Sequence, residues 1–307
     1  MKYSFLLPAF KGGFLKEALS SLQAQTFVDF VVLVSDDCSP EPIYDIVRPF
    51  LSDSRFMYRR NDINIGAAAL PSHWNLILEQ CESPYVVMAG DDDIYDPRFL
   101  EEIDKLVLQF PQVNLLRAGL DKIDSNGTVI ETEQAFSPFQ DSQQFIYELF
   151  DKRHQHGVGQ FVFKTSYLKS VGGFYDLPLA WFSDDATAII ASKQGVAHTS
   201  SVLFHARISD SSISGQPNST LFVKMKAKSI NSFYLWFKSF LKEQDLSPQK
   251  RYDLRKQCRI YCYDRIMNVY YGLSIKDRLI TLSTFPFFSW MSIKNRINLW
   301  IKQLSNR

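Results

Sequence analysis

Long apolar runs, clustered cysteines and an excess of one charge are all missing from this chain of 307 residues. No stretch approaches the roughly 20 consecutive apolar residues that a membrane-spanning helix needs. The four cysteines lack the spacing of a zinc site, and two of them, Cys258 and Cys262, stand one helical turn apart. The N-terminus, "MKYSFLLPAF", has one lysine and reaches Pro8 after a short apolar run, which predicts a first strand and not a signal peptide. We therefore expect a cytoplasmic protein with reduced thiols.

The net charge of +1 conceals an uneven distribution along the chain. Residues 221–307 hold 17 Lys and Arg against 5 Asp and Glu, a net charge of +12. Residues 1–220 hold 17 basic against 28 acidic residues, a net charge of −11. Such a shift indicates two functional parts, and we expect one domain over residues 1–215 and a basic, aromatic-rich helical region over residues 216–307.

Strands and helices alternate in the first of these parts. Four apolar segments predict strands, and three segments with one apolar face predict helices. The predicted strands cover residues 3–9, 29–37, 55–60 and 83–90, and the predicted helices cover residues 14–25, 42–51 and 69–81. This alternation predicts a doubly wound α/β sheet of the Rossmann-like type. In such sheets, ligands bind beyond the carboxyl ends of the strands.

Acidic residues follow two of the predicted strands. Asp36 and Asp37 end one of them, and Asp91, Asp92 and Asp93 follow another with no base in between. A solvated turn would explain the first pair, since Asp is common in turns. Three adjacent carboxylates after a buried strand repel one another, so a cation is expected opposite them. A divalent ion held by one or two carboxylates, with phosphate and water as its other ligands, fits this pattern.

Three motifs occur in a fixed order: "SFLLPAFKGGFLKEALSSLQAQTFVDFVVLVSDDCSP", "NDINIGAAALPSHWNLIL" and "GDDDIYDP". Together they resemble the family 2 glycosyltransferases with the GT-A fold, over about residues 1–215. The resemblance implies an inverting enzyme of the bacterial polysaccharide or lipopolysaccharide type, which uses a nucleotide-diphosphate sugar and Mg²⁺ or Mn²⁺.

The resemblance also implies roles for individual residues on the donor side. Pro8 and Ala9 match the strand end that packs against the nucleotide base. Asp37 matches the residue that hydrogen-bonds the base, usually uracil, and Asp36 and Asp91 belong to the same nucleotide site.

The metal ligands implied by the resemblance are Asp92 and the adjacent Asp93. In "FHARISDSSISG", Arg207 matches a basic residue that reaches the diphosphate. The segment "PSHWN" departs from the family, because Trp74 stands where relatives often have an arginine that contacts phosphate. His73 either takes over that contact or has a structural role.

The resemblance places the residues that act on the acceptor in the segment "SVGGFYDLPLAWFSDDATAII". Asp185 matches the general base for the acceptor hydroxyl, with Asp184 beside it. The alternative is that one of these residues only caps the following helix. Trp181 is expected either to stack on an acceptor sugar or to lie in the core.

The C-terminal part interleaves aromatic and basic residues, as in "SFYLWFKSFLK" and "RKQCRIYCYDRIMNVYY". Two interpretations fit this composition. In the first, the helices lie on an anionic membrane surface, and the lipid-linked acceptors of many relatives favour this interpretation. In the second, the helices form a bundle that packs on the enzyme. Nucleic-acid binding is not expected, because the N-terminal part is acidic.

The sequence thus predicts transfer of a sugar from a nucleotide-diphosphate donor, with UDP as the expected nucleotide, to a glycan or lipid-linked acceptor. Two alternatives remain. A metal-dependent sugar nucleotidyltransferase would need a glycine-rich loop that binds a triphosphate near the first strand. The segment "KGGF" is too short to match such a loop well. A non-catalytic nucleotide-sugar-binding protein would keep the donor site without the base.

Overall fold

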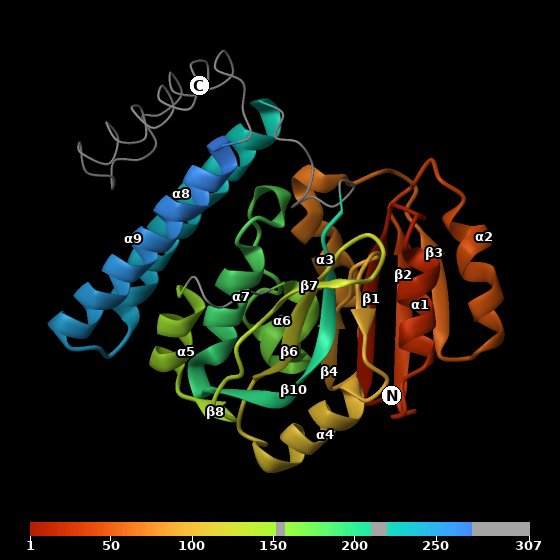
Figure 1. Cartoon of the computed structure of the whole chain (residues 1–307), viewed down its shortest axis with the longest axis horizontal. Coiled ribbons are helices and arrows are strands. Elements are labelled where there is room, and N and C mark those ends of the chain that lie inside the picture. The colour runs from red at the N-terminus through yellow and green to blue at the C-terminus, as the bar shows by residue number, and fades with distance from the viewer. Residues whose placement is uncertain (152–156, 210–219, 272–307) are drawn as a thin grey trace.

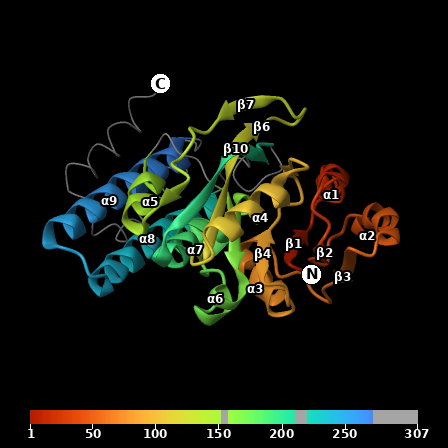
Figure 2. The ribbon, with the colours of Figure 1, turned by 90° about the horizontal axis from the view of Figure 1, so that it is seen from below.

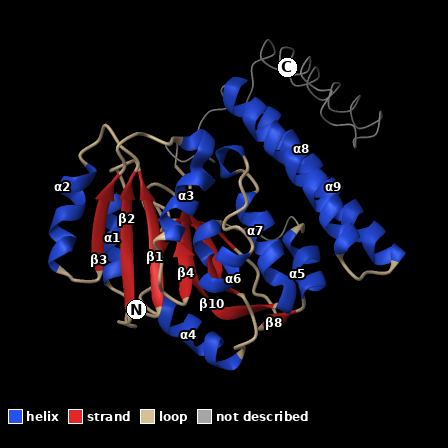
Figure 3. Ribbon diagram, turned by 180° about the vertical axis from the view of Figure 1, so that it is seen from behind, coloured by secondary structure: helices blue, strands red, loops and turns tan. Residues whose placement is uncertain are grey.

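A mixed β-sheet with helices on both faces forms the centre of the protein (Figure 3). The computed structural model describes residues 1–151, 157–209 and 220–271. The strands are β1 (Tyr3–Ala9), β2 (Phe30–Asp36), β3 (Phe56–Arg60), β4 (Tyr85–Met88), β5 (Ile94–Tyr95), β6 (Leu115–Ile123), β7 (Val129–Thr132), β8 (Phe139–Gln140), β9 (Phe161–Lys164) and β10 (Val196–Arg207). The helices are α1 (Leu15–Gln23), α2 (Ile43–Val47), α3 (Leu70–Glu79), α4 (Phe99–Gln109), α5 (Ser142–Leu149), α6 (Thr165–Ser170), α7 (Ser183–Ala191), α8 (Thr220–Glu243) and α9 (Pro248–Tyr271).

The strand order of the sheet is β3-β2-β1-β4-β9-β6-β10-β5, with β7 beside β6 and β8 beside β10. Figure 1 shows β3, β2, β1 and β4 in this order. The first four strands are parallel, which confirms the predicted α/β architecture. The second half differs, because β9 runs antiparallel to both of its neighbours, β4 and β6. The helix expected over residues 42–51 is shorter, since α2 is followed by a 3-10 turn that contains Pro49, a residue without a backbone N–H.

Strands β1 and β4 are buried on both faces, as their apolar runs predict. In β1, Phe5 and Leu7 pack in a core with α1, α2 and α4, whereas Leu6 packs in a second core with the helices of the other face. Successive side chains of a strand point to opposite faces, so one apolar run serves two cores.

The described part of the C-terminal region is a hairpin of two long helices, α8 and α9. They lie side by side at the end of the molecule opposite α2 (Figures 1 and 2). Phe233, Phe237 and Leu241 follow one another at a spacing of four on α8 and are buried in the same core as Cys258 and Cys262 of α9. Over residues 220–271 the apolar face therefore packs on the enzyme.

The predicted boundary at residue 215 and the end of the chain after residue 271 fall outside the described residues. The domain division and the membrane contact of the C-terminal region stay predictions. None of the helices in the described ranges is long and apolar enough to cross a membrane.

Candidate functional site

A cavity of about 1130 Å³ opens where β1, β2 and β4 end. This is the edge at which parallel α/β sheets bind ligands. Both acidic segments predicted from the sequence contribute to it. The predicted site residues that line the cavity are Pro8, Ala9, Asp37, Asp91, Asp92, Asp93 and Arg207. Asp36, Asp184 and Asp185 do not belong to this lining.

Asp37 holds the loop that follows β3 against the cavity. Its Oδ1 accepts hydrogen bonds from the Ile65 N–H (2.9 Å) and from Nδ2 of Asn61 (2.9 Å), and its Oδ2 accepts one from the Gly66 N–H (2.8 Å). Gly66 has a φ of 79°, which a residue with a Cβ rarely adopts. A carboxylate has about four acceptor positions, so Oδ2 of Asp37 keeps one for a ligand.

The neighbouring Asp36 has a different environment. Its carboxylate is fully buried and accepts hydrogen bonds from the Tyr58 hydroxyl (2.7 Å), the Ser39 N–H (2.8 Å) and the Arg60 guanidinium. These contacts tie β2 to β3 and to the turn after β2. The predicted nucleotide contact of Asp36 stays a prediction, and the geometry favours a structural role.

His73 and Trp74 form the α3 side of the cavity. Nε2 of His73 lies 2.9 Å from Oγ of Ser35, and burial lowers the pKa of His73, so the imidazole beside Asp37 is neutral. Trp74 is buried and packs edge-to-face on Phe174, with 5.5 Å between the ring centroids. Neither side chain offers a positive charge to a phosphate.

The three consecutive aspartates are held from two sides. Oδ2 of Asp91 accepts hydrogen bonds from the N–H groups of Phe10 and Lys11, both at 3.0 Å, at the end of β1. Oδ1 of Asp93 accepts one from the N–H of Arg207, at 3.0 Å, at the end of β10. The sheet order therefore brings these carboxylates to the cavity.

Asp92 lies between two carboxylates that are already engaged. Burial, with the charge of Asp91 as the second cause, raises the pKa of Asp92 to about 6, and burial also raises the pKa values of Asp91 and Asp93. Gly90 allows this crowding, since a Cβ there would lie 2.6 Å from Oδ2 of Asp93. Crowded carboxylates of this kind favour a bound cation, and their hard oxygen ligands suit Mg²⁺ or Mn²⁺.

The described residues contain no group of three or more His, Cys, Asp or Glu arranged to hold a metal ion. Asp92 and Asp93 can therefore supply part of a coordination shell, and phosphate oxygens and water would have to complete it. Mg²⁺ commonly binds in this way, through one or two carboxylates and a phosphate.

Arg207 is fully buried and its guanidinium is bound within the protein. Nε donates to the carbonyl of Asp92 (2.9 Å), Nη1 donates to the carbonyl of Asp124 (3.1 Å) and Nη2 donates to Oε2 of Glu17 (2.7 Å). The guanidinium also lies over the ring of Phe14, 4.2 Å from its centroid. These contacts hold the aspartate loop in place, and the predicted contact with a diphosphate stays a prediction.

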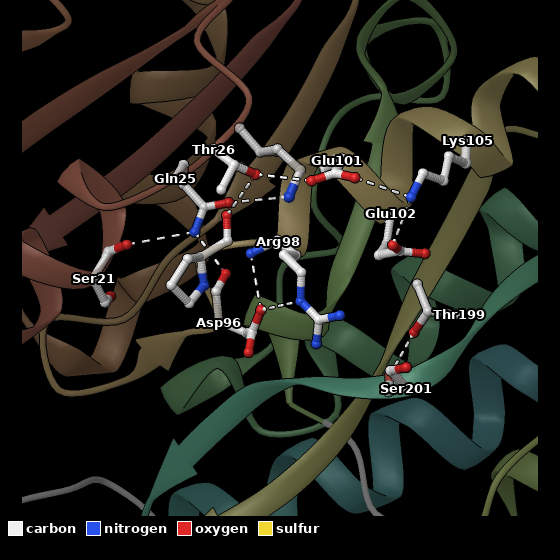
Figure 4. A network of polar contacts seen from close by, with 12 residues as sticks. Ser21, Gln25, Thr26, Asp96, Arg98, Glu101, Glu102, Lys105, Thr199 and Ser201 are labelled. Carbon is white, nitrogen blue, oxygen red and sulfur yellow. Dashed lines mark hydrogen bonds and ion pairs between the residues drawn. The ribbon is translucent and has the colours of Figure 1, made fainter.

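A polar network fixes the segment that follows the aspartates (Figure 4). The Gln25 side chain donates to the carbonyl of Asp96 (2.8 Å) and accepts from the N–H of Leu100 (3.0 Å). The N–H of Thr26 donates to the carbonyl of Pro97 (2.8 Å). The end of α1 thus anchors the start of α4 and, through it, the loop that carries the carboxylates.

The second acidic pair lies in the first turn of α7. Oδ1 of Asp184 accepts a hydrogen bond from the N–H of Asp185 (3.0 Å). Asp185 is only 3% exposed, and its Oδ2 accepts a hydrogen bond from the Tyr261 hydroxyl of α9 (3.3 Å). The N-cap position belongs to Phe182, so neither aspartate is the N-cap residue.

The turn before this pair has an uncommon backbone. Leu179, Ala180 and Phe182 have φ values of 61°, 53° and 70°. Left-handed conformations are rare for residues other than glycine, cost roughly 1–3 kcal/mol each, and cluster at functional sites. The surrounding structure must therefore hold this turn.

One wall of the cavity consists of residues to which no role was assigned from the sequence. Tyr261, Asp264, Arg265 and Asn268 of α9 line it. Their spacing of i, i+3, i+4 and i+7 places them on one face of the helix. These polar residues, which recur on one helix face within an aromatic-rich segment, were the sequence pattern from which this wall could have been predicted.

A mixed sheet with a carboxylate-lined cavity at its parallel strand ends is the GT-A architecture expected from the resemblance, and this prediction is confirmed. The chain belongs to glycosyl transferase family 2, whose model matches residues 4–166. The matched range contains Asp37 and the three aspartates after β4. It ends before Asp184.

Two relatives match part of the chain. An uncharacterized glycosyltransferase of Methanocaldococcus jannaschii is 26% identical over 160 residues, which are 52% of this chain and 53% of the relative. The poly(ribitol-phosphate) beta-N-acetylglucosaminyltransferase TarS of Staphylococcus aureus is 29% identical over 105 residues, which are 33% of this chain and 18% of TarS. The chain thus spans about half of the first relative and about a fifth of the second.

Two solved structures share the fold over nearly the whole chain. TarS 1-349 in complex with UDP-GlcNAc has a TM-score of 0.66 at 16% identity, over 99% of this chain and 81% of that chain. A mannosyltransferase from Pyrobaculum calidifontis in complex with GDP-Man and Mn²⁺ has a TM-score of 0.56 at 14% identity, over 100% of this chain and 88% of that chain. At these identities the likeness concerns the fold.

Proposed function

We propose that the protein is an inverting glycosyltransferase that moves a sugar from a nucleotide-diphosphate donor to a hydroxyl group of a glycan or lipid-linked acceptor. The observation that carries the proposal is one cavity, in a family 2 chain, that combines Asp37 with three aspartates at the ends of parallel strands. UDP is the proposed nucleotide, and the complex of TarS with UDP-GlcNAc supports it.

On the donor side, Pro8 and Ala9 at the end of β1 are proposed to pack against the base. The remaining acceptor position of Asp37 is proposed to receive an N–H of the base. Asp91 has a positioning role, because both main-chain N–H groups that it accepts from belong to the segment after Ala9.

Asp92 and Asp93 are the proposed ligands of Mg²⁺ or Mn²⁺. The Mn²⁺ in the Pyrobaculum mannosyltransferase complex supports the choice of a divalent ion. When bound, the ion would neutralise the negative charge that develops on the diphosphate leaving group. Arg207 holds this segment in place, since its Nε donates to the main-chain carbonyl of Asp92 and its main-chain N–H donates to the carboxylate of Asp93.

On the acceptor side, Asp185 is the proposed general base. Inversion by direct displacement requires a base on the sugar face away from the leaving group. Asp184, whose Oδ1 accepts a hydrogen bond from the N–H of Asp185, is the second candidate.

The geometry after β1 argues against a nucleotidyltransferase. Such an enzyme needs backbone N–H groups that are available to a triphosphate. Here the N–H groups of Phe10 and Lys11 donate to Asp91, and the N–H of Gly12 donates to Oε2 of Glu41 at 2.7 Å. Carboxylates therefore occupy the donors that a triphosphate would require.

The proposed setting is cell-surface polysaccharide synthesis at the cytoplasmic face of the inner membrane, with peripheral contact through the C-terminal region, residues 216–307. The similarity to TarS, a poly(ribitol-phosphate) beta-N-acetylglucosaminyltransferase, supports a polymeric acceptor. No nucleic-acid partner is proposed.

Titration of UDP against wild type and Asp92→Asn, with Mn²⁺ or with EDTA, tests the donor site. In Mn²⁺, we expect the affinity of Asp92→Asn for UDP to fall by about tenfold, or about 1.4 kcal/mol, to the level of wild type in EDTA. Glu79→Gln removes an exposed charge away from the cavity and is the matched control. Equal affinity of Asp92→Asn and wild type in Mn²⁺ would contradict the proposal. A panel of UDP-, GDP- and dTDP-sugars then identifies the donor.

A further inference from the structure

The proposed base does not reach the cavity directly. Asp185 is 3% exposed and is absent from the cavity lining. A general base must lie within hydrogen-bond reach of the proton that it removes, either directly or through one water molecule. The side chain between Asp185 and the cavity is Tyr261, which lines the cavity and donates its hydroxyl hydrogen to Oδ2 of Asp185 at 3.3 Å.

Helix α8 fixes the turn that carries the base. Oγ of Ser229 donates to the carbonyl of Pro178 (2.7 Å), and the ring of Phe233 packs on Phe182 with 4.8 Å between centroids. This turn contains the three residues with left-handed backbone. Two contacts from α8 thus hold a conformation that is costly by itself, and they set where Asp185 lies.

Helix α9 fixes the tyrosine. The ring of Tyr261 packs against Phe150 and Phe182, with centroid distances of 5.2 Å and 5.3 Å. Nη2 of Arg265, one turn further along α9, donates to the Tyr261 oxygen at 3.4 Å, and its guanidinium lies 5.1 Å from the ring centroid. The hydroxyl is therefore oriented between a guanidinium and a carboxylate.

We propose that the Tyr261 hydroxyl is a catalytic relay, which passes the acceptor's proton from the cavity to Asp185. The inference rests on the proposed function, because it takes Asp185 as the final proton acceptor. Arg265 is the positioning residue, and its charge stabilises the partial negative charge that the Tyr261 oxygen carries during transfer.

In the proposed relay, two proton transfers and the displacement at the donor sugar occur in one concerted step. The acceptor hydroxyl gives its proton to the Tyr261 oxygen, while Tyr261 gives its own proton to Oδ2 of Asp185. The acceptor oxygen forms a bond to the anomeric carbon of the donor sugar with the electron pair that this releases. The bond from that carbon to the phosphate oxygen breaks, and the nucleoside diphosphate leaves with the electron pair of that bond.

A double-mutant cycle in the full chain, with kcat for sugar transfer as the readout, tests the relay. Tyr261→Phe removes the hydroxyl and keeps the ring that packs on Phe150 and Phe182. We expect Tyr261→Phe to lower kcat by about tenfold or more, with the KM for the donor within about threefold of wild type. In the Asp185→Asn background, Tyr261→Phe should have no further effect, because both variants interrupt one proton path.

Two other variants separate chemistry from folding. Tyr263→Phe removes a hydroxyl from the same helix outside the cavity lining and should leave kcat unchanged. Arg265→Gln should lower kcat less than Tyr261→Phe, because the hydroxyl path remains. Thermal midpoints of all the variants are compared with wild type.

Three results would overturn the relay: a loss of kcat below tenfold in Tyr261→Phe, effects of Tyr261→Phe and Asp185→Asn that multiply, or a loss of kcat that a fall in the thermal midpoint accounts for. If Asp185→Asn itself leaves kcat unchanged, the base of the proposed function is wrong, and that failure is distinct from a failure of Tyr261 alone.

Discussion

The two acidic clusters of this protein are held in place in different ways. Asp91, Asp92 and Asp93 border the cavity directly, and main-chain N–H groups at the ends of β1 and β10 hold two of them. Asp184 and Asp185 lie at the start of α7, behind a wall that the C-terminal hairpin supplies.

The difference concerns what determines the position of a carboxylate. The first cluster depends on the register and order of neighbouring strands, which parallel sheets impose on any residue at a strand end. The second depends on side chains from α8 and α9, which come 51 and 76 residues later in the chain than the residues that they contact. Changes in the hairpin should therefore damage turnover before they damage donor binding, and changes near β4 should do the opposite.

The largest expected effect comes from Phe233→Ala. Phe233 is fully buried between the hairpin and the turn before α7, and truncating a buried phenylalanine costs about 3–5 kcal/mol of the free energy of unfolding. Chemical denaturation measures this loss. Leu235→Ala, on the same helix and 48% exposed, is the control and should change the free energy of unfolding by less than about 0.5 kcal/mol. Equal stability of the two variants would show that the hairpin does not support the turn.

The second-largest effect is expected from the variant Asp185→Asn. Proton removal from the acceptor occurs in the transition state, so kcat should fall by about 100-fold or more while the affinity for the donor stays within a few-fold of wild type. Steady-state kinetics with a separate UDP titration measures both. Asp184→Asn keeps an oxygen that can accept the hydrogen bond from the N–H of Asp185, and it should have a smaller effect. A larger loss in Asp184→Asn would exchange the roles of the two residues.

Gly90→Ala tests the first cluster without removing a charge. The added Cβ would lie 2.6 Å from Oδ2 of Asp93 and 3.1 Å from Oδ1 of Asp92, so the carboxylates must move. We expect the affinity for UDP in Mn²⁺ to fall by about three- to tenfold, or about 0.7–1.4 kcal/mol, with little change in EDTA. Gly13→Ala meets no atom within 4 Å and is the matched control. Unchanged metal-dependent affinity in Gly90→Ala would argue that these carboxylates do not bind the ion.

The smallest effect is expected on the outer surface of the hairpin. Tyr252 and Ile260 of α9 are 51% and 42% exposed, and the variant Tyr252→Ser/Ile260→Ser should change the free energy of unfolding by less than about 0.5 kcal/mol per site. Co-sedimentation with anionic lipid vesicles at low and high salt should match wild type. A loss of vesicle binding in this variant would place the membrane contact on α9.

Local patterns in the sequence determined much of the donor half of this protein. The apolar runs before Asp37 and Asp91 predicted buried parallel strands, and the rule for ligand sites at strand ends predicted that their aspartates share one edge. Both predictions needed only residues that are close in sequence, together with the right-handed connections of parallel strands, and both agree with the structure.

Only the tertiary structure decided the acceptor half and the partners of individual charges. The antiparallel β9, the engagement of Arg207 with Glu17 and the contact of Tyr261 with Asp185 join residues far apart in the chain. Such contacts depend on how whole elements pack, because a buried charge takes whichever partner the fold brings to it, and neither composition nor periodicity specifies that partner. For the same reason, composition left two interpretations of the aromatic and basic C-terminal segment. The structure places the apolar face of α8 and α9 in the core, and contact of the C-terminal region with a membrane stays a prediction.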